Sequence, residues 1–134
     1  MADGRKKYYR QGRYLTGLVS ISRRKYFFDK KGYLLRDSWG TIGRKKYRTN
    51  KNGTIIKDRL VTVDKKVYYL KKNGVMKKGW KIFNSKKSYF GSNGARVTGL
   101  RKIGKKRYYF NKKGIMQTGT KKVKSTTYYL DEKG

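Results

Sequence analysis

The chain has no cysteine and no histidine. Without cysteine it can form no disulfide and offers no thiolate nucleophile, and without both residues it lacks the usual zinc ligands. The absence of histidine also removes the side chain that most often serves as a general base. We therefore expect no metal site, no cofactor and no enzymatic activity.

Acidic residues are also scarce, with 7 Asp and Glu against 39 Lys and Arg, which gives a formal net charge of +32 on 134 residues. Such an excess of positive charge attracts polyanions, among them phosphate polymers, nucleic acids and anionic lipid surfaces. No apolar run approaches the roughly 18 residues that a membrane-spanning helix needs, so we expect no transmembrane insertion.

Glycoside hydrolysis depends on a pair of acidic residues, so we considered whether any of the few carboxylates could form such a pair. Each of them has a turn explanation instead, because Asp tolerates the left-handed backbone conformation and can hydrogen-bond to its own backbone. Asp29 and Asp131 follow an aromatic triplet, Asp64 occupies another turn, and Asp37 and Asp58 stand where other copies of the repeat have glycine. We expect no catalytic pair among them.

Glycine, by contrast, recurs with a fixed period. The seven period glycines, spaced 20 or 21 residues apart, are Gly12, Gly32, Gly53, Gly74, Gly94, Gly114 and Gly134. Regular self-similarity of this kind indicates a repeat array, in which each unit is too small to bury its own apolar face and must stack on its neighbours.

The residue pattern of each repeat predicts two short strands joined by a turn, followed by a second turn at the period glycine. The second strand carries an aromatic triplet, as in Tyr108-Tyr109-Phe110, whose alternation places apolar rings on both faces. We therefore predict an all-β fold, a solenoid of stacked β-hairpins built from repeats of about 20 residues. Residues 1–134 would form a single repeat domain of about six to seven hairpin repeats, with the first and last incomplete. The copy at residues 42–53 is degenerate, since Arg48 and Thr49 replace apolar residues, and we expect it to be the least stable.

Cations recur at the same two places in the repeat. In the first turn they are expected to form one polyanion-binding ridge, made of Arg23, Arg24, Lys25, Arg44, Lys45, Lys46, Lys65, Lys66, Lys86, Lys87, Lys105, Lys106 and Arg107. A second ridge is predicted from Lys30, Lys31, Lys51, Lys71, Lys72, Lys112 and Lys113, just before the period glycines. Regular rows of positive charge would bind regular rows of phosphate in a multivalent and salt-sensitive way.

Four aromatic residues are candidates for stacking on the flat C–H faces of sugars: Trp39, Trp80, Tyr14 and Tyr33. Packing between repeats is the competing interpretation of the same rings, because so charged a chain has few other ways to build a core.

The segments GVMKKGWKIFNSKKSYFGSNG and KKRYYFNKKGIMQTG resemble the short aromatic repeats of Gram-positive surface proteins, which are called cell-wall-binding, choline-binding or glucan-binding repeats. The resemblance extends over essentially all 134 residues. It implies stacked hairpins with a non-catalytic role, attaching a protein to wall polymers or to extracellular polysaccharide.

The choline-binding branch of that family has a Trp just before the aromatic triplet, where it forms part of a cage for the quaternary amine. Here this place is taken by Lys25, Lys46, Val67, Lys87, Arg107 and Thr127. A cation in that place would repel choline, so we do not expect this cage to work here. The Trp of the Gly-Trp pair remains as Trp80, with Trp39 as its equivalent after a one-residue insertion.

The preferred function is therefore a non-catalytic, extracellular module at the bacterial cell surface that binds anionic cell-wall polymer of the teichoic-acid type, exopolysaccharide, or both. One alternative is a lectin-like module for neutral α-glucan, and another is a non-specific nucleic-acid-binding protein, although no specific nucleic-acid motif is present. Unpaired strand edges and apolar rings at the ends of the array also predict a homodimer.

Overall fold

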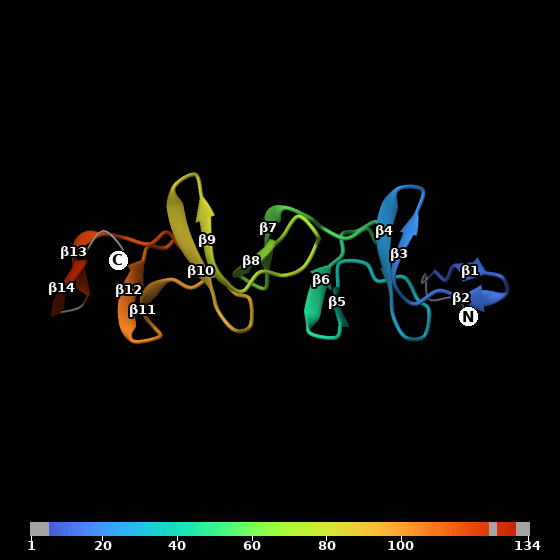
Figure 1. Ribbon diagram of the computed structural model, residues 1–134, viewed down its shortest axis with the longest axis horizontal. Helices are drawn as coiled ribbons and strands as arrows, with labels where there is room; N and C mark the ends of the chain where they lie inside the picture. The colour runs from blue at the N-terminus through green and yellow to red at the C-terminus, as the bar shows by residue number, and fades with distance from the viewer. Residues whose placement is uncertain (1–5, 124–125, 131–134) are drawn as a thin grey trace. The chain divides into compact units, whose positions relative to one another are not determined.

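The computed structural model describes residues 6–123 and 126–130 of the chain, and the side chains of residues 6–119 (Figure 1). Gly134 and Asp131 therefore lie outside the described residues. No described part of the chain forms a helix with the length and apolar character needed to cross a membrane.

Strands within the described residues pair with their neighbours in the sequence as two-stranded antiparallel sheets, so each pair is a hairpin. The strands are β1 (Tyr9–Arg10), β2 (Arg13–Tyr14), β3 (Gly17–Ile21), β4 (Arg24–Phe28), β5 (Trp39–Ile42), β6 (Lys45–Arg48), β7 (Arg59–Val63), β8 (Lys66–Leu70), β9 (Gly79–Phe83), β10 (Lys86–Phe90), β11 (Gly99–Ile103), β12 (Lys106–Phe110), β13 (Gly119–Val123) and β14 (Thr126–Leu130). The predicted all-β fold of stacked hairpins, built from repeats of about 20 residues, is confirmed.

Several hairpins close through tight turns whose backbone matches the twist of the strands. Ser22 and Arg23 have φ values of 51° and 68°, and Asp64 with Lys65 and Asn84 with Ser85 repeat this pair of positive angles. Two successive positive φ angles are typical of the type I′ turn, which two-residue hairpins favour. The turns thus present their side chains, many of them cationic, at the hairpin tips.

The most deeply buried side chains of the core come from the third residue of each aromatic triplet. Phe28 is 1% exposed, and Leu70, Phe90 and Phe110 are fully buried. In the degenerate copy this place belongs to Thr49, which is also fully buried. Its hydroxyl accepts a hydrogen bond from the Ser38 N–H at 3.1 Å and donates one to the Ser38 carbonyl at 3.3 Å, which satisfies the buried polar group.

Successive repeats are joined through the residue two places after each period glycine. Ile55 donates its backbone N–H to the Lys25 carbonyl at 3.0 Å, and Met76 donates to the Lys46 carbonyl at 2.8 Å. Each loop therefore bonds to a hairpin of the preceding repeat rather than only to its own. These hydrogen bonds stack the hairpins that could not be stable alone.

The side chain at this joint position packs on the backbone of the next period glycine. Leu34 covers Gly53 in this way, and Ile55 covers Gly74. Tyr14 covers Gly32, so a tyrosine that we expected to stack on sugar is part of an inter-repeat joint. Gly32, Gly53 and Gly74 are therefore required for two reasons, a φ of +87° and the absence of a Cβ.

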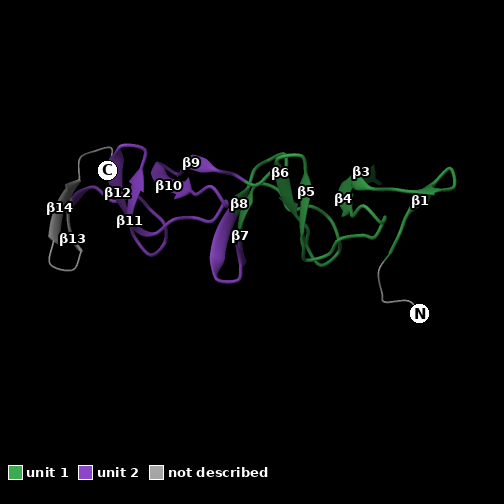
Figure 2. Ribbon diagram, turned by 90° about the horizontal axis from the view of Figure 1, so that it is seen from below, with its two compact units in different colours: residues 1–61, 69–76 green, residues 62–68, 77–134 purple. Residues whose placement is uncertain are grey.

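Contacts divide the chain into two compact units (Figure 2). Unit 1 comprises residues 1–61 and 69–76, and unit 2 comprises residues 62–68 and 77–134. The proposal that residues 1–134 form one repeat domain stays a prediction.

Candidate functional site

The cations of the predicted first ridge lie at the hairpin tips, in the turn or at the start of the second strand. All of them are exposed except Lys87, which is half-buried on β10 opposite Ile82. Exposed lysines and arginines in turns keep their charged groups in solvent and are available to a ligand.

The tips of successive hairpins do not form one ridge. Figure 1 shows the β3–β4 turn and the β5–β6 turn at opposite sides of unit 1, and the β9–β10 and β11–β12 turns at opposite sides of unit 2. The prediction of a single row is therefore wrong within each unit. The sequence period fixes where a turn falls in the repeat, but the direction of the hairpin also depends on its rotation relative to the previous one.

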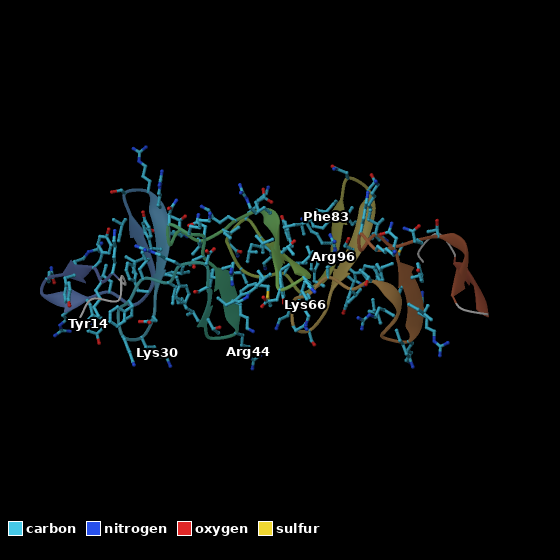
Figure 3. All side chains as sticks on the ribbon, turned by 180° about the vertical axis from the view of Figure 1, so that it is seen from behind. Tyr14, Lys30, Arg44, Lys66, Phe83 and Arg96 are labelled. Atoms are coloured by element: carbon cyan, nitrogen blue, oxygen red, sulfur yellow. The ribbon has the colours of Figure 1, made fainter. Side chains whose placement is uncertain are left out.

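In unit 1, cations of the two predicted ridges come to the same side instead. Figure 3 places Lys30, from the turn after β4, and Arg44, from the β5–β6 turn, along the same lower edge. Lys31 lies in the first of these turns, Lys45 and Lys46 begin β6 directly after the second, and all five side chains are exposed. We call these two segments, residues 29–32 and 43–46, the basic edge.

An aromatic cluster around Trp80 joins two hairpins of unit 2. The centre of the Trp80 ring lies 5.0 Å from the ring centre of Tyr89 in its own hairpin and 4.9 Å from that of Tyr108 in the next hairpin. Both pairs of rings are arranged edge to face. It also lies 5.8 Å from Phe110, on the same face of β12 as Tyr108. Trp80 is half-buried, so it packs between repeats while part of it remains accessible.

Trp39 occupies the same register position as Trp80, because it pairs with Arg48 just as Trp80 pairs with Tyr89. The one-residue insertion inferred from the sequence is confirmed by this register. The Arg48 guanidinium lies 5.5 Å from the centre of the Trp39 ring, a cation–π contact in place of the aromatic partner that Trp80 has.

Tyr14 and Tyr33 also hold a cation of the chain itself. The Lys7 ammonium lies 4.7 Å from the centre of the Tyr14 ring and 4.5 Å from that of Tyr33. Nothing in the sequence period indicates this contact, because Lys7 precedes the first full repeat. Sugar stacking by Tyr14, Tyr33, Trp39 and Trp80 stays a prediction, and the four residues belong to two different units.

The described carboxylates have structural roles. Asp29 accepts hydrogen bonds from the backbone N–H groups of Lys31 and Tyr33, both at 2.9 Å, and so closes its own turn. Asp37 and Asp58 have φ values of 45° and 51°, the left-handed conformation that glycine adopts at the corresponding place in other copies. Their predicted turn roles are confirmed.

Asp58 has a second role as a hydrogen-bond acceptor for Tyr69, whose hydroxyl lies 2.6 Å from its carboxylate. This hydrogen bond, together with burial and the negative charge of Asp58, raises the pKa of Tyr69. The contact fixes the end of β8 to the residue before β7.

Two families of known repeats match parts of this sequence. A choline-binding repeat family matches residues 97–134, and a putative cell wall binding repeat family matches residues 58–76. The chain belongs to this family of choline-binding and cell-wall-binding repeats. No curated protein sequence matches it significantly.

Several solved members of the family from pneumococcus and its phage share the fold. Choline binding protein F of Streptococcus pneumoniae, crystallised with a peptidoglycan analogue, is 31% identical over 98% of this chain and 49% of its own, with a TM-score of 0.80. CbpJ of Streptococcus pneumoniae is 30% identical over 92% of this chain and 42% of its own, with a TM-score of 0.77. A pneumococcal cell wall endolysin of phage Cp-1, complexed with choline, is 28% identical over 89% of this chain and 36% of its own, with a TM-score of 0.61. The chain thus spans at most about half the length of these relatives.

Proposed function

We propose that the chain is a non-catalytic module that attaches a protein to the bacterial cell surface by binding an anionic wall polymer of the teichoic-acid type. The observation that carries the proposal is the repeated placement of adjacent, exposed cations at the hairpin tips. Membership of the cell-wall-binding repeat family supports the cell surface as its location.

The basic edge of unit 1 is the best candidate for the first contact with such a polymer. Lys30 and Arg44 approach the same edge from two consecutive repeats, so one polymer strand can contact both turns (Figure 3). Lysine ammonium groups bind phosphates as point charges without demanding a fixed geometry, which suits a flexible polymer. Each additional contact releases counterions and adds to a multivalent affinity.

Choline recognition is a second candidate function, favoured by the geometry of Trp80. A quaternary ammonium group binds against aromatic faces, and Trp80 and Tyr108 offer two rings from neighbouring hairpins. The related endolysin was crystallised with choline. Lys87, however, stands where the choline-binding branch has its Trp, so we confine this function to the Trp80 cluster. A teichoic acid that carries choline would engage both the cations and this cluster.

The test is binding of the full chain to purified bacterial walls before and after removal of their phosphate polymers, with free choline as a competitor. We expect the removal to abolish most of the binding and choline to displace little of it. Binding that survives the removal would contradict the proposal, and displacement by choline would assign the attachment to the Trp80 cluster.

The neutral α-glucan and nucleic-acid alternatives are tested by binding to other polymers. A module for neutral α-glucan would bind glucan in high salt, since sugar stacking does not depend on charge. A non-specific nucleic-acid binder would prefer DNA or RNA to wall polymer at equal phosphate concentration.

A further inference from the structure

Unit 2 contains a basic cleft of about 560 Å³, within the size range of small-molecule sites. It lies between the tip of the β7–β8 hairpin, the loop from Gly91 to Thr98, and β11. Its cationic lining residues are Lys65, Lys66, Arg96, Arg101, Lys102 and Lys112. None of the described residues that line it is acidic, so the cations are not neutralised from within the cleft.

Arg96 is unusual because it occupies the joint position between repeats. Two residues after the period glycine, other copies have Leu34, Ile55 and Met76, all of them apolar and buried. Arg96 packs its side chain over Gly114 as Leu34 does over Gly53, so it serves as a joint and still carries a guanidinium. An aliphatic residue would fill this joint without any desolvation of charge.

The surrounding backbone fixes the position of Arg96. Its N–H donates to the Val67 carbonyl at 2.7 Å, and it forms a β-bridge with Phe90. Burial lowers the pKa of Arg96, because the charged form loses part of its hydration. No carboxylate among the described residues pairs with it. A partly buried cation without an anionic partner is costly, and an anionic ligand would remove that cost.

We propose that this cleft is a discrete binding site for one phosphodiester group together with its adjoining sugar or polyol, and that Arg96 is its central ligand. The inference rests on the proposed function and names a specific site for the polymer. Arginine presents a planar pair of donors that matches two phosphate oxygens, while the neighbouring Lys66 and Arg101 supply further positive charge. Lys66 and Arg96, both residues of unit 2, are labelled in Figure 3.

The remaining lining suits the uncharged part of such a ligand. Ser92, Asn93 and Thr98 offer hydroxyl and amide groups that can hydrogen-bond to a polyol, and Tyr89 offers an aromatic ring. The cleft is also larger than a bare phosphate requires. These features favour a phosphodiester within a polymer over free phosphate, although both contain the same anionic group.

The test uses the full chain, a short glycerol-phosphate oligomer and inorganic phosphate, measured by calorimetry at a salt concentration that screens diffuse attraction. The variant is Arg96→Met, which introduces the residue found at the same joint in Met76 and should therefore keep the fold. The matched control is Arg36→Met, which removes the same charge from an exposed position of unit 1. Thermal unfolding of both variants verifies that they remain folded.

We expect Arg96→Met to lower the affinity for the oligomer by about tenfold or more and Arg36→Met to change it by less than about twofold. The affinity of Arg96→Lys for the oligomer should lie between those of the two Met variants, because lysine keeps the charge and loses the bidentate geometry. Equal losses in Arg96→Met and Arg36→Met would overturn the site. Inorganic phosphate binding as tightly as the oligomer would overturn the assignment to a phosphodiester with its polyol.

This outcome can be separated from the proposed function. If the cleft is not a site but the chain is a wall-polymer module, both variants will still bind intact walls and lose that binding when the phosphate polymers are removed. If the proposed function itself is wrong, the parent chain will bind the stripped walls as well as the intact ones.

Discussion

The side chain of Leu34 fills the space that a Cβ on Gly53 would need, with Leu34 Cδ2 only 2.7 Å from that position. The two residues belong to consecutive repeats, and their contact recurs between Ile55 and Gly74. The interface between repeats thus depends on a glycine backbone pressed against an aliphatic side chain, and packing at native density leaves no room for an added methyl group.

Gly53→Ala should therefore be strongly destabilising. The backbone at Gly53 has a φ of +87°, which costs an alanine about 1–2 kcal/mol, and displacement of Leu34 adds a further cost of about 1–3 kcal/mol. Gly17→Ala is the matched control, because its φ is +73° and its added Cβ would meet only Ile42 Cδ1 at 3.8 Å. Chemical denaturation should show a larger loss for Gly53→Ala, and equal losses would refute the packing role.

In the degenerate copy, stability is expected to depend on the buried hydroxyl of Thr49. Thr49→Val is nearly isosteric and more apolar, yet we expect it to lower the free energy of unfolding by about 1–3 kcal/mol, since the Ser38 N–H would lose its acceptor. Thr49→Ser keeps the hydroxyl and removes one methyl group, which should cost about 1 kcal/mol. A Val variant as stable as the parent would show that this hydrogen bond contributes nothing.

Much of this architecture could be predicted from local sequence. The glycine period and the aromatic triplets place the hairpins and their turns correctly, because strand alternation and positive φ are properties of a few adjacent residues. The burial of Phe110 and the contact of Trp80 with both Tyr108 and Phe110 follow from the same alternation.

Relationships between repeats could not be predicted in the same way. The rotation that separates the β3–β4 and β5–β6 turns depends on long-range hydrogen bonds such as Ile55 N–H to the Lys25 carbonyl, which the period does not reveal. The basic cleft was missed for the same reason. Its one available signal was Arg96, a charged residue in a place where Leu34 and Ile55 are apolar.

The Tyr69–Asp58 hydrogen bond predicts a pH dependence of stability. The pKa of Tyr69 is raised in the folded state, so the folded chain holds this proton more tightly than the unfolded chain. The stabilisation is complete below the unfolded pKa of about 10 and is lost as the pH rises through the folded value. Denaturation at several alkaline pH values should show this additional loss in the parent chain and not in Tyr69→Phe. The same alkaline loss in both proteins would contradict the assignment.

Self-association is expected to increase with salt. Around the β1–β2 hairpin Tyr8 is 44% exposed and Tyr9 63% exposed, and exposed apolar rings favour a partner. The large positive charge opposes the approach of two chains until salt screens it. Analytical ultracentrifugation should therefore detect more dimer at high salt, whereas a monomer at both salt concentrations would refute the homodimer prediction.

Charge and aromatic recognition can be separated within the full chain. Replacement of Lys30, Lys31, Lys45 and Lys46 with Gln should leave the fold intact, because all four side chains are exposed, and should weaken binding to phosphate polymer. The matched control replaces four other exposed cations, Lys6, Arg13, Lys57 and Lys78, with Gln. It removes the same net charge, so any greater loss in the first variant belongs to the basic edge and not to the overall field.

Trp80→Ala should have the opposite effect. Removal of a ring that contacts Tyr89, Tyr108 and Phe110 should lower the free energy of unfolding by about 3 kcal/mol, while molecules that stay folded keep their attraction to the polymer. For the parent chain, the logarithm of the affinity should fall linearly with the logarithm of the salt concentration, and the slope should become shallower in the basic-edge variant but not in Trp80→Ala. If the basic-edge variant binds as tightly as the parent while folded Trp80→Ala loses binding, attachment depends on the aromatic cluster, and glucan or choline replaces phosphate as the ligand.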